Sequence, residues 1–166
     1  GARSRAVGER SPFERPERIL TSRSGARTPL QALHGMITPS GLHFERHHGG
    51  VPQIDPDRHH LLIHGMVERA LKLSLDEIKR FPSVSRICFI ECAGNLYWYA
   101  REENTPGDIC GMTSQSEWTG VLLSTLFREV GIKPKATWFL AEGADAAVMT
   151  RSVPMSKGWD DAIIAY

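Results

Sequence analysis

The stretch Ser85–Asn95 constrains the fold and the chemistry of this chain more than any other part of the sequence. Residues 85–90 predict a short strand, because β-branched and aromatic residues fill a run that is bounded by turn-forming residues. Side chains alternate along a strand, so Cys88, Ile90 and Cys92 are expected on one face. The Ala-Gly-Asn sequence that follows predicts a turn. Cys92 is therefore expected at the carboxyl end of a strand, where open α/β sheets usually form their ligand sites.

A cysteine in this position has two interpretations. A thiol beside backbone N–H groups ionises readily, and the thiolate is the form that binds metals or attacks electrophiles. The alternative is a buried, small apolar side chain, which is how most free cysteines behave. The three cysteines, Cys88, Cys92 and Cys110, are too few for a disulfide scaffold and lack the paired C-x-x-C spacing of a structural zinc site.

Composition limits the class of protein. A chain of 166 residues with 41% hydrophobic and 23% charged residues is long enough for one sizeable core and is typical of soluble globular proteins. The net charge of +1 gives no indication of a nucleic-acid partner. The sequence has no long apolar run, which argues against a transmembrane helix and against a signal peptide.

The first 27 residues differ in composition from the rest of the chain. Residues 1–27 are rich in Arg, Ser, Glu and Gly and poor in periodic apolar residues, so an extended or disordered arm is expected there. The interspersed glutamates weaken a nucleic-acid interpretation of the arginines and favour an arm that wraps a neighbour. Residues 28–166 are expected to form one domain.

A cationic loop follows Phe44. Two glycines and a proline predict a loop after Arg46, His47 and His48, which lie at its mouth. Arginine and other donor groups beside backbone N–H groups suit an oxyanion or a phosphate. The alternative is a histidine-rich surface loop. A zinc site would need further ligands at suitable spacing, and the nearby sequence supplies none clearly.

Four further strands are predicted from apolar runs between turn signals, at residues 59–64, 136–140, 148–153 and 162–166. The second of these is expected to be buried, because its residues are almost all apolar. A short helix that begins at Pro154 is expected between the last two strands.

Two more helices have clear start or stop signals. Ser74 and Glu77 form a capping box that starts the first. Residues 116–121 lead into the second, which Gly131 ends. The apolar stripe of this second helix consists of Leu122, Leu123, Leu126, Phe127 and Val130. By contrast, residues 96–113 show no clear period and predict a long loop.

Several separated motifs resemble, in the same order, those of the sulfite oxidase family. Phe-Ile-Glu-Cys-Ala-Gly-Asn resembles the motif that carries the family's molybdenum-ligating cysteine. Phe-x-Arg-x-His followed by Asp-Pro resembles the opening of its molybdopterin domain. The resemblance covers residues 28–166 and implies an α+β fold with a mixed sheet, Cys92 as the molybdenum ligand and Arg46 as the active-site arginine. The residues implied to hold the molybdopterin are Phe44, Glu45, Arg46, His47, His48, Cys92 and Asp145.

The resemblance also implies a reaction, the two-electron oxidation of a sulfur substrate with an oxygen atom derived from water. The run Gly-Leu-His-Phe-Glu-Arg-His-His-Gly-Gly-Val-Pro is most similar to the molybdenum subunits of sulfane (sulfite) dehydrogenases in the bacterial Sox system. This branch implies a periplasmic protein that oxidises a sulfur-carrier-bound sulfane or sulfite and passes electrons to a c-type cytochrome subunit. The full-length form is implied to be an oligomer.

Other members of the family stay open as alternatives. In vertebrate-type sulfite oxidases two arginines that help to hold sulfite follow the cysteine motif, whereas Leu96 and Tyr97 stand here. This departure argues against plain sulfite as the optimal substrate. A sulfite dehydrogenase, a methionine-sulfoxide reductase or a nitrate reductase would share Cys92. Family members continue with further pterin-binding residues and a β-sandwich domain, so the domain is expected to be incomplete at its C-terminal end. A cofactor-free, non-catalytic fragment and a zinc protein that uses the histidine loop are the remaining alternatives.

Overall fold

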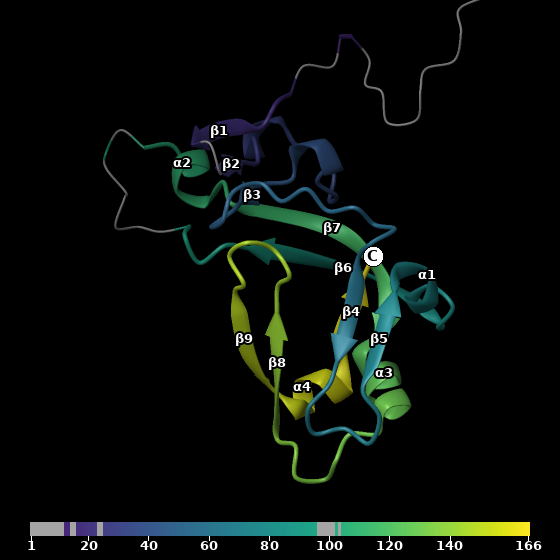
Figure 1. Cartoon of the computed structure of the whole chain (residues 1–166). Coiled ribbons are helices and arrows are strands. Elements are labelled where there is room, and N and C mark those ends of the chain that lie inside the picture. Colours follow the sequence, from purple (N-terminus) through teal and green to yellow (C-terminus); the bar gives the residue numbers. More distant parts are fainter. Residues whose placement is uncertain (1–11, 14–15, 23–24, 96–101, 103) are drawn as a thin grey trace, which may run out of the picture.

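The computed structural model describes residues 12–13, 16–22, 25–95, 102 and 104–166. Within them the chain has the α+β architecture predicted from its sequence, with short helices beside four small sheets (Figure 1). All strand pairs among these residues are antiparallel. Leu96 and Tyr97, on which the argument against sulfite depends, lie outside the described residues.

The central sheet has the strand order β10-β7-β6. Its two long strands are β6 (Ser83–Glu91) and β7 (Thr113–Leu122), and Figure 1 shows them crossing the middle of the molecule. Their register pairs each residue of β6 with one of β7, from Ser83 with Val121 to Glu91 with Thr113. The short β10 (Ile163–Ala165) pairs with the last residues of β7. Strand β6 confirms the strand predicted at residues 85–90.

Strand β7 corrects the prediction, which places only the approach to a helix at residues 116–121. Its sequence, Thr-Ser-Gln-Ser-Glu-Trp-Thr-Gly-Val-Leu, begins with five polar residues and shows no apolar alternation. Local pattern therefore does not mark it as a strand. The continuous ladder with β6 supplies its backbone hydrogen bonds, which is a tertiary effect that overrides local preference.

Three smaller sheets surround this pair. One has the order β1-β2-β3, one pairs β4 with β5, and one pairs β8 with β9. Figure 1 shows β1–β3 on one side of the long pair and β8 and β9 on the other. Their bounds are β1 Ile19–Ser22, β2 Gly25–Arg27, β3 Glu45–Arg46, β4 His60–Ile63, β5 Leu71–Ser74, β8 Trp138–Glu142 and β9 Thr150–Pro154. Strands β4, β8, β9 and β10 confirm the four predicted from apolar runs, and β1 and β2 lie within the segment 1–27.

The four α-helices among the described residues are short. They are α1 Leu75–Ile78, α2 Pro106–Cys110, α3 Leu123–Val130 and α4 Met155–Asp160, with 3-10 turns at Leu30–Ala32 and Ser40–Leu42. The capping box of Ser74 and Glu77 is present, as predicted. Helix α2 corrects the prediction of an unbroken loop over 96–113, because Thr105 and Asp108 form a second capping box. No helix in the described part of the chain is long and apolar enough to cross a membrane.

Helix α3 supplies much of the core and confirms its predicted apolar stripe. Leu123, Leu126, Phe127 and Val130 are all buried, whereas Leu122 is the last residue of β7. The helix ends at Gly131, whose φ of +67° is a left-handed conformation that glycine adopts without strain. Two clusters of buried side chains meet on this helix, one under β4, β5 and α1 and one under α4.

Two apolar strands are more exposed than the sequence indicates. Strand β8 is predicted to be buried, but Trp138 and Leu140 are each 59% exposed. On β6, Ile87 is 52% exposed and Phe89 is 64% exposed. Periodicity predicts which side chains share a face of a strand, but it does not predict whether another element covers that face. Strand β6 has a neighbour on one edge only among the described residues, and β8 pairs with β9 alone.

Candidate functional site

Cys92 lies directly after β6, at the turn that the sequence predicts. Its backbone N–H donates to the carbonyl of Met112 (3.0 Å), which extends the β6–β7 ladder by one step. The N–H of Gly94 donates to Cys92 Sγ across 3.4 Å. The side chain is half-buried, and all three cysteines are free. A half-buried thiol that accepts a backbone N–H suits a thiolate ligand better than an inert core residue.

The cationic loop is tied to the same face of the β6–β7 pair. The N–H of Phe44 donates to Ser114 Oγ (3.0 Å), and Ser114 also shares a hydrogen bond with Thr28 (2.8 Å). Ser114 pairs with Ile90 across the two strands, and paired residues point to one face of a sheet. Alternation places Cys92 on the face of Ile90. The loop therefore approaches the face of the sheet on which Cys92 lies.

An aromatic contact that the sequence does not indicate reinforces this attachment. His43 stacks on Phe44 with ring centroids 5.2 Å apart, and it meets Trp118 edge-on at 6.0 Å. The indole N–H of Trp118 donates to the carbonyl of Cys88 (3.1 Å), so the contact reaches across to β6. His43 Nδ1 faces the Phe44 carbonyl (3.0 Å), while its buried Nε2 has no partner among the described residues.

Glu45 and Arg46 have different surroundings although both form β3. The Glu45 carboxylate binds the Arg18 guanidinium through one oxygen and faces His47 Nε2 (3.4 Å) through the other. The hydrogen bond from Arg18 holds the pKa of Glu45 below its ordinary value, and the contact with His47 adds to this. Arg46 is exposed and donates to the His47 carbonyl (3.1 Å). Glu45 thus anchors the loop, and Arg46 keeps donors available for an anion.

Substituting Glu45 by glutamine is expected to lower stability in a pH-dependent way. Because the folded-state pKa is depressed, the carboxylate stabilises the fold above its unfolded value of 4.5, and this contribution is lost as pH falls through the lowered pKa. The pair is partly exposed, so the difference should not exceed about 1 kcal/mol. Thermal unfolding of the wild type and of Glu45→Gln between pH 3 and pH 7 measures this difference, which should appear as a Tm difference on the order of a few degrees. Glu117→Gln, at an exposed strand residue, is the matched control. A difference that grows on acidification would contradict the expectation.

Asp145 lies in the turn between β8 and β9. The turn is closed by hydrogen bonds from Val148 N–H to the Asp145 carbonyl and from Gly143 N–H to the Met149 carbonyl, each 3.0 Å. Gly49 packs against the next two residues of this turn. A Cβ on Gly49 would lie 2.8 Å from the Ala147 nitrogen and 3.0 Å from the carbonyl carbon of Ala146. Glycine therefore lets the cationic loop lie directly against the turn that carries Asp145.

The same turn contains a strained residue, and relieving the strain should stabilise the protein. Val148 has φ +45°, a region that β-branched residues avoid at a cost of about 1–3 kcal/mol. Its side chain is 54% exposed, so little packing is lost on substitution. Val148→Asn is expected to raise Tm by about 2–4 °C, because asparagine adopts this conformation more readily. Val51→Asn, at a 60% exposed valine without positive φ, is the control. An unchanged Tm for Val148→Asn would contradict the strain argument.

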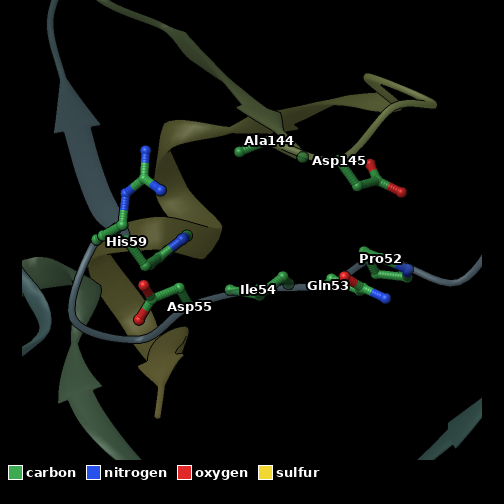
Figure 2. Close-up of a pocket in the computed structure, with 9 residues that line it drawn as sticks. Pro52, Gln53, Ile54, Asp55, His59, Ala144 and Asp145 are labelled. Carbon is green, nitrogen blue, oxygen red and sulfur yellow. The ribbon is translucent and has the colours of Figure 1, made fainter.

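An open pocket of about 610 Å³ lies between the Asp145 turn and the segment that follows the cationic loop. Figure 2 shows Pro52–Asp55 along one side and Ala144 and Asp145 along the other, with His59 at the end away from Asp145. The pocket is lined by Pro52, Gln53, Ile54, Asp55, Arg58, His59, Gly143, Ala144 and Asp145. It carries acidic groups as well as an arginine and a histidine, so it has no single charge.

The structure places the predicted site residues in three segments. Residues 44–48 include β3 and the start of the cationic loop, Asp145 lies in the turn against which this loop packs, and Cys92 directly follows β6. Of the predicted residues, Asp145 alone lines the pocket. No hydrogen bond or ion pair joins Cys92 to the loop or to Asp145 in the described part of the chain.

A zinc site finds no support in this arrangement. Among the described residues, no group of three or more His, Cys, Asp or Glu side chains could hold a metal ion. The histidines of the cationic loop therefore have no complete ligand set in this part of the chain. A metal that takes its other ligands from a cofactor needs only one thiolate from the protein, whereas a zinc site needs a complete set of protein ligands.

Comparison with known proteins identifies relatives along most of the chain. The family model described as an oxidoreductase molybdopterin binding domain matches residues 48–166. The NADH nitrate reductase of Volvox carteri is 36% identical over 162 residues, which cover 83% of this chain and 18% of that protein. The NADH nitrate reductase of Ulva prolifera is 36% identical over 108 residues, covering 61% of this chain and 12% of that protein.

A solved structure matches nearly the whole chain. The sulfane dehydrogenase SoxCD from Paracoccus pantotrophus superposes with a TM-score of 0.84 and 36% sequence identity, and it covers 99% of this chain. This chain spans 46% of that chain and less than a fifth of either nitrate reductase.

Proposed function

This chain belongs to the sulfite oxidase family of oxidoreductase molybdopterin-binding domains, and we propose that Cys92 is its molybdenum ligand. The observation that carries the proposal is the position of the Cys92 thiol, half-buried at the end of β6 with the Gly94 N–H directed at its sulfur. A thiolate is the soft donor that accompanies the sulfur ligands of a molybdopterin. The cationic loop and Asp145 lie in neighbouring segments and complete the proposed binding site.

The donor set of this chain fits a molybdopterin. Arg46, His47 and His48 supply donors for an anionic group, of which Arg46 and His48 are exposed. Asp145 is an acceptor for pterin N–H groups, and Gly49 keeps it close to the loop. Phe44, stacked on His43, offers an apolar surface. Glu45 acts indirectly in this proposal, because its carboxylate is engaged by Arg18 and His47.

The residues of this chain have distinct parts in the proposed reaction. The cofactor, when bound, supplies the two-electron redox chemistry and the site of oxygen-atom transfer. Cys92 binds the metal and tunes it through the hydrogen bond from Gly94. Arg46 attracts the anionic substrate and orients it through paired N–H donors.

We propose a sulfur substrate, either sulfite or the sulfane sulfur of a carrier-bound intermediate, with a c-type cytochrome as electron acceptor in the periplasm. Two observations support it, the sequence of the cationic loop and the 0.84 TM-score to a sulfane dehydrogenase over 99% of this chain. Nitrate reduction is the second candidate, because two curated relatives that are 36% identical are nitrate reductases. We also propose one domain at residues 28–166 and an N-terminal arm at residues 1–27. This organisation is compatible with sulfur oxidation and with nitrate reduction.

Activity assays distinguish the two candidate functions. They use protein purified from a host that makes the cofactor. Sulfite- or thiosulfate-dependent reduction of cytochrome c, without nitrate-dependent oxidation of reduced viologen, is expected for a sulfur oxidoreductase. The reverse pattern would overturn the sulfur substrate and establish nitrate reduction. Absence of molybdenum from the purified protein would overturn both and leave the non-catalytic alternative.

A further inference from the structure

The side chain of Asn95 makes an unusual number of contacts for a turn residue. Its Oδ1 accepts from the Met112 N–H (2.9 Å), and its Nδ2 donates to the Met112 carbonyl (3.0 Å) and Thr113 Oγ1 (2.9 Å). Glu91 Oε1 and the Cys110 carbonyl lie farther away, each at 3.3 Å. The amide has two N–H groups, so the two shorter contacts use them and the longer two share them.

These contacts extend the β6–β7 ladder past its last backbone pair. The Met112 carbonyl accepts from both the Cys92 N–H and the Asn95 amide, and the Met112 N–H donates to that same amide. The Asn95 N–H closes the turn by donating to the Cys92 carbonyl (2.9 Å). The backbone N–H of Cys92 is therefore bonded to Met112, and its backbone carbonyl is bonded to Asn95.

The sulfur of Cys92 lies in the same turn. Gly94, between Cys92 and Asn95, directs its N–H at Cys92 Sγ. Gly94 lies close to both residues, because an added Cβ would lie 3.0 Å from Met112 Cε and 3.5 Å from Cys92 Sγ. We propose that Asn95 is a positioning residue for the Cys92 thiol, which clamps residues 92–95 onto residues 110–113 and holds the Gly94 N–H against the sulfur. The use of this geometry in metal binding rests on the function proposed for Cys92.

The first test uses the protein without cofactor. Asn95→Asp keeps the size of the side chain but replaces the N–H donor by a carboxylate oxygen that faces carbonyl and hydroxyl oxygens. Loss of the clamp is expected to raise the alkylation rate of Cys92 by iodoacetamide about tenfold, because a turn without these hydrogen bonds opens more often and admits the reagent. Peptide mass spectrometry separates the cysteines, and exposed Cys88 is the reference in the same molecule. Thr113→Val, which removes one acceptor only, should give a smaller rise and remains informative if Asn95→Asp folds poorly.

The second test uses the protein loaded with molybdopterin. A residue that positions the sulfur should alter the sulfur-to-metal charge-transfer absorption when replaced, an effect that general destabilisation does not produce. Gln115→Glu is the control, because it converts an amide into a carboxylate on β7 and removes the hydrogen bond to the Met36 carbonyl (2.8 Å). Unchanged alkylation of Cys92 in both variants, or equal changes in Gln115→Glu, would overturn the proposal. A wild-type protein without molybdenum would overturn the proposed function alone, since the alkylation test needs no metal.

Discussion

Replacing Cys92 by serine is expected to abolish molybdenum binding while leaving the fold intact. A serine hydroxyl is a hard donor that stays protonated at neutral pH, so it replaces a thiolate poorly beside sulfur co-ligands. Molybdenum in protein purified from a cofactor-producing host should fall from about one atom per chain to nearly none. The thiol is only half-buried, so Tm of the cofactor-free protein should change little.

The other two cysteines supply the controls for this experiment. Cys88 and Cys110 are both exposed and free, so Cys88→Ser and Cys110→Ser should retain molybdenum at the wild-type level. Elemental analysis of metal and fluorescence of the released pterin measure the two parts of the cofactor separately. Molybdenum retained in Cys92→Ser, or lost equally in all three variants, would contradict the assignment of Cys92 as the ligand.

Replacing Gly49 by alanine is expected to weaken cofactor binding by separating the cationic loop from the Asp145 turn. The new Cβ would lie 2.8 Å from the backbone nitrogen of Ala147, so one segment must move. Overpacking of this kind costs about 1–3 kcal/mol, which corresponds to roughly a 5- to 150-fold loss of affinity if it must be overcome on binding. Pterin content per chain and Tm should both fall, the latter by several degrees.

Gly107→Ala is the matched control for this substitution. Gly107 lies in α2, and an added Cβ there would meet only ordinary contacts, at 3.7 Å from Thr105 Oγ1 and 3.9 Å from Gln31 Oε1. Alanine is also favoured over glycine inside a helix, so this variant should keep wild-type pterin content and stability. Equal pterin content in Gly49→Ala and Gly107→Ala would show that the contact with Ala147 does not position the loop.

Structural elements whose signals lie within a few residues of each other were predicted well from the sequence. The capping box of Ser74 and Glu77, the apolar stripe of α3 and the stop at Gly131 are all present. The strand at residues 85–90 is also present, as β6. Each of these depends on neighbours in the sequence, either through helix geometry or through alternation along one strand.

Pairing between distant segments was predicted poorly. Strand β7 is half polar and has no period of its own, so its pairing with β6 and β10 makes it a strand. The exposure of Trp138 on β8 likewise depends on which elements lie nearby. Helix α2 is a different case, because its capping box of Thr105 and Asp108 is a local signal that the prediction of a loop overlooked.

For the site, the sequence alone determined the chemistry that is available: a thiol at a strand end, an arginine with histidines in a glycine-rich loop, and an acid in a later turn. Only the tertiary structure decided how these groups are held. Phe44 is tied to Ser114, Gly49 packs on Ala147, and Asn95 clamps the Cys92 turn to Met112. The physical reason is that side-chain chemistry belongs to each residue, whereas hydrogen bonds and close contacts between segments up to about a hundred residues apart exist only after the whole domain has packed.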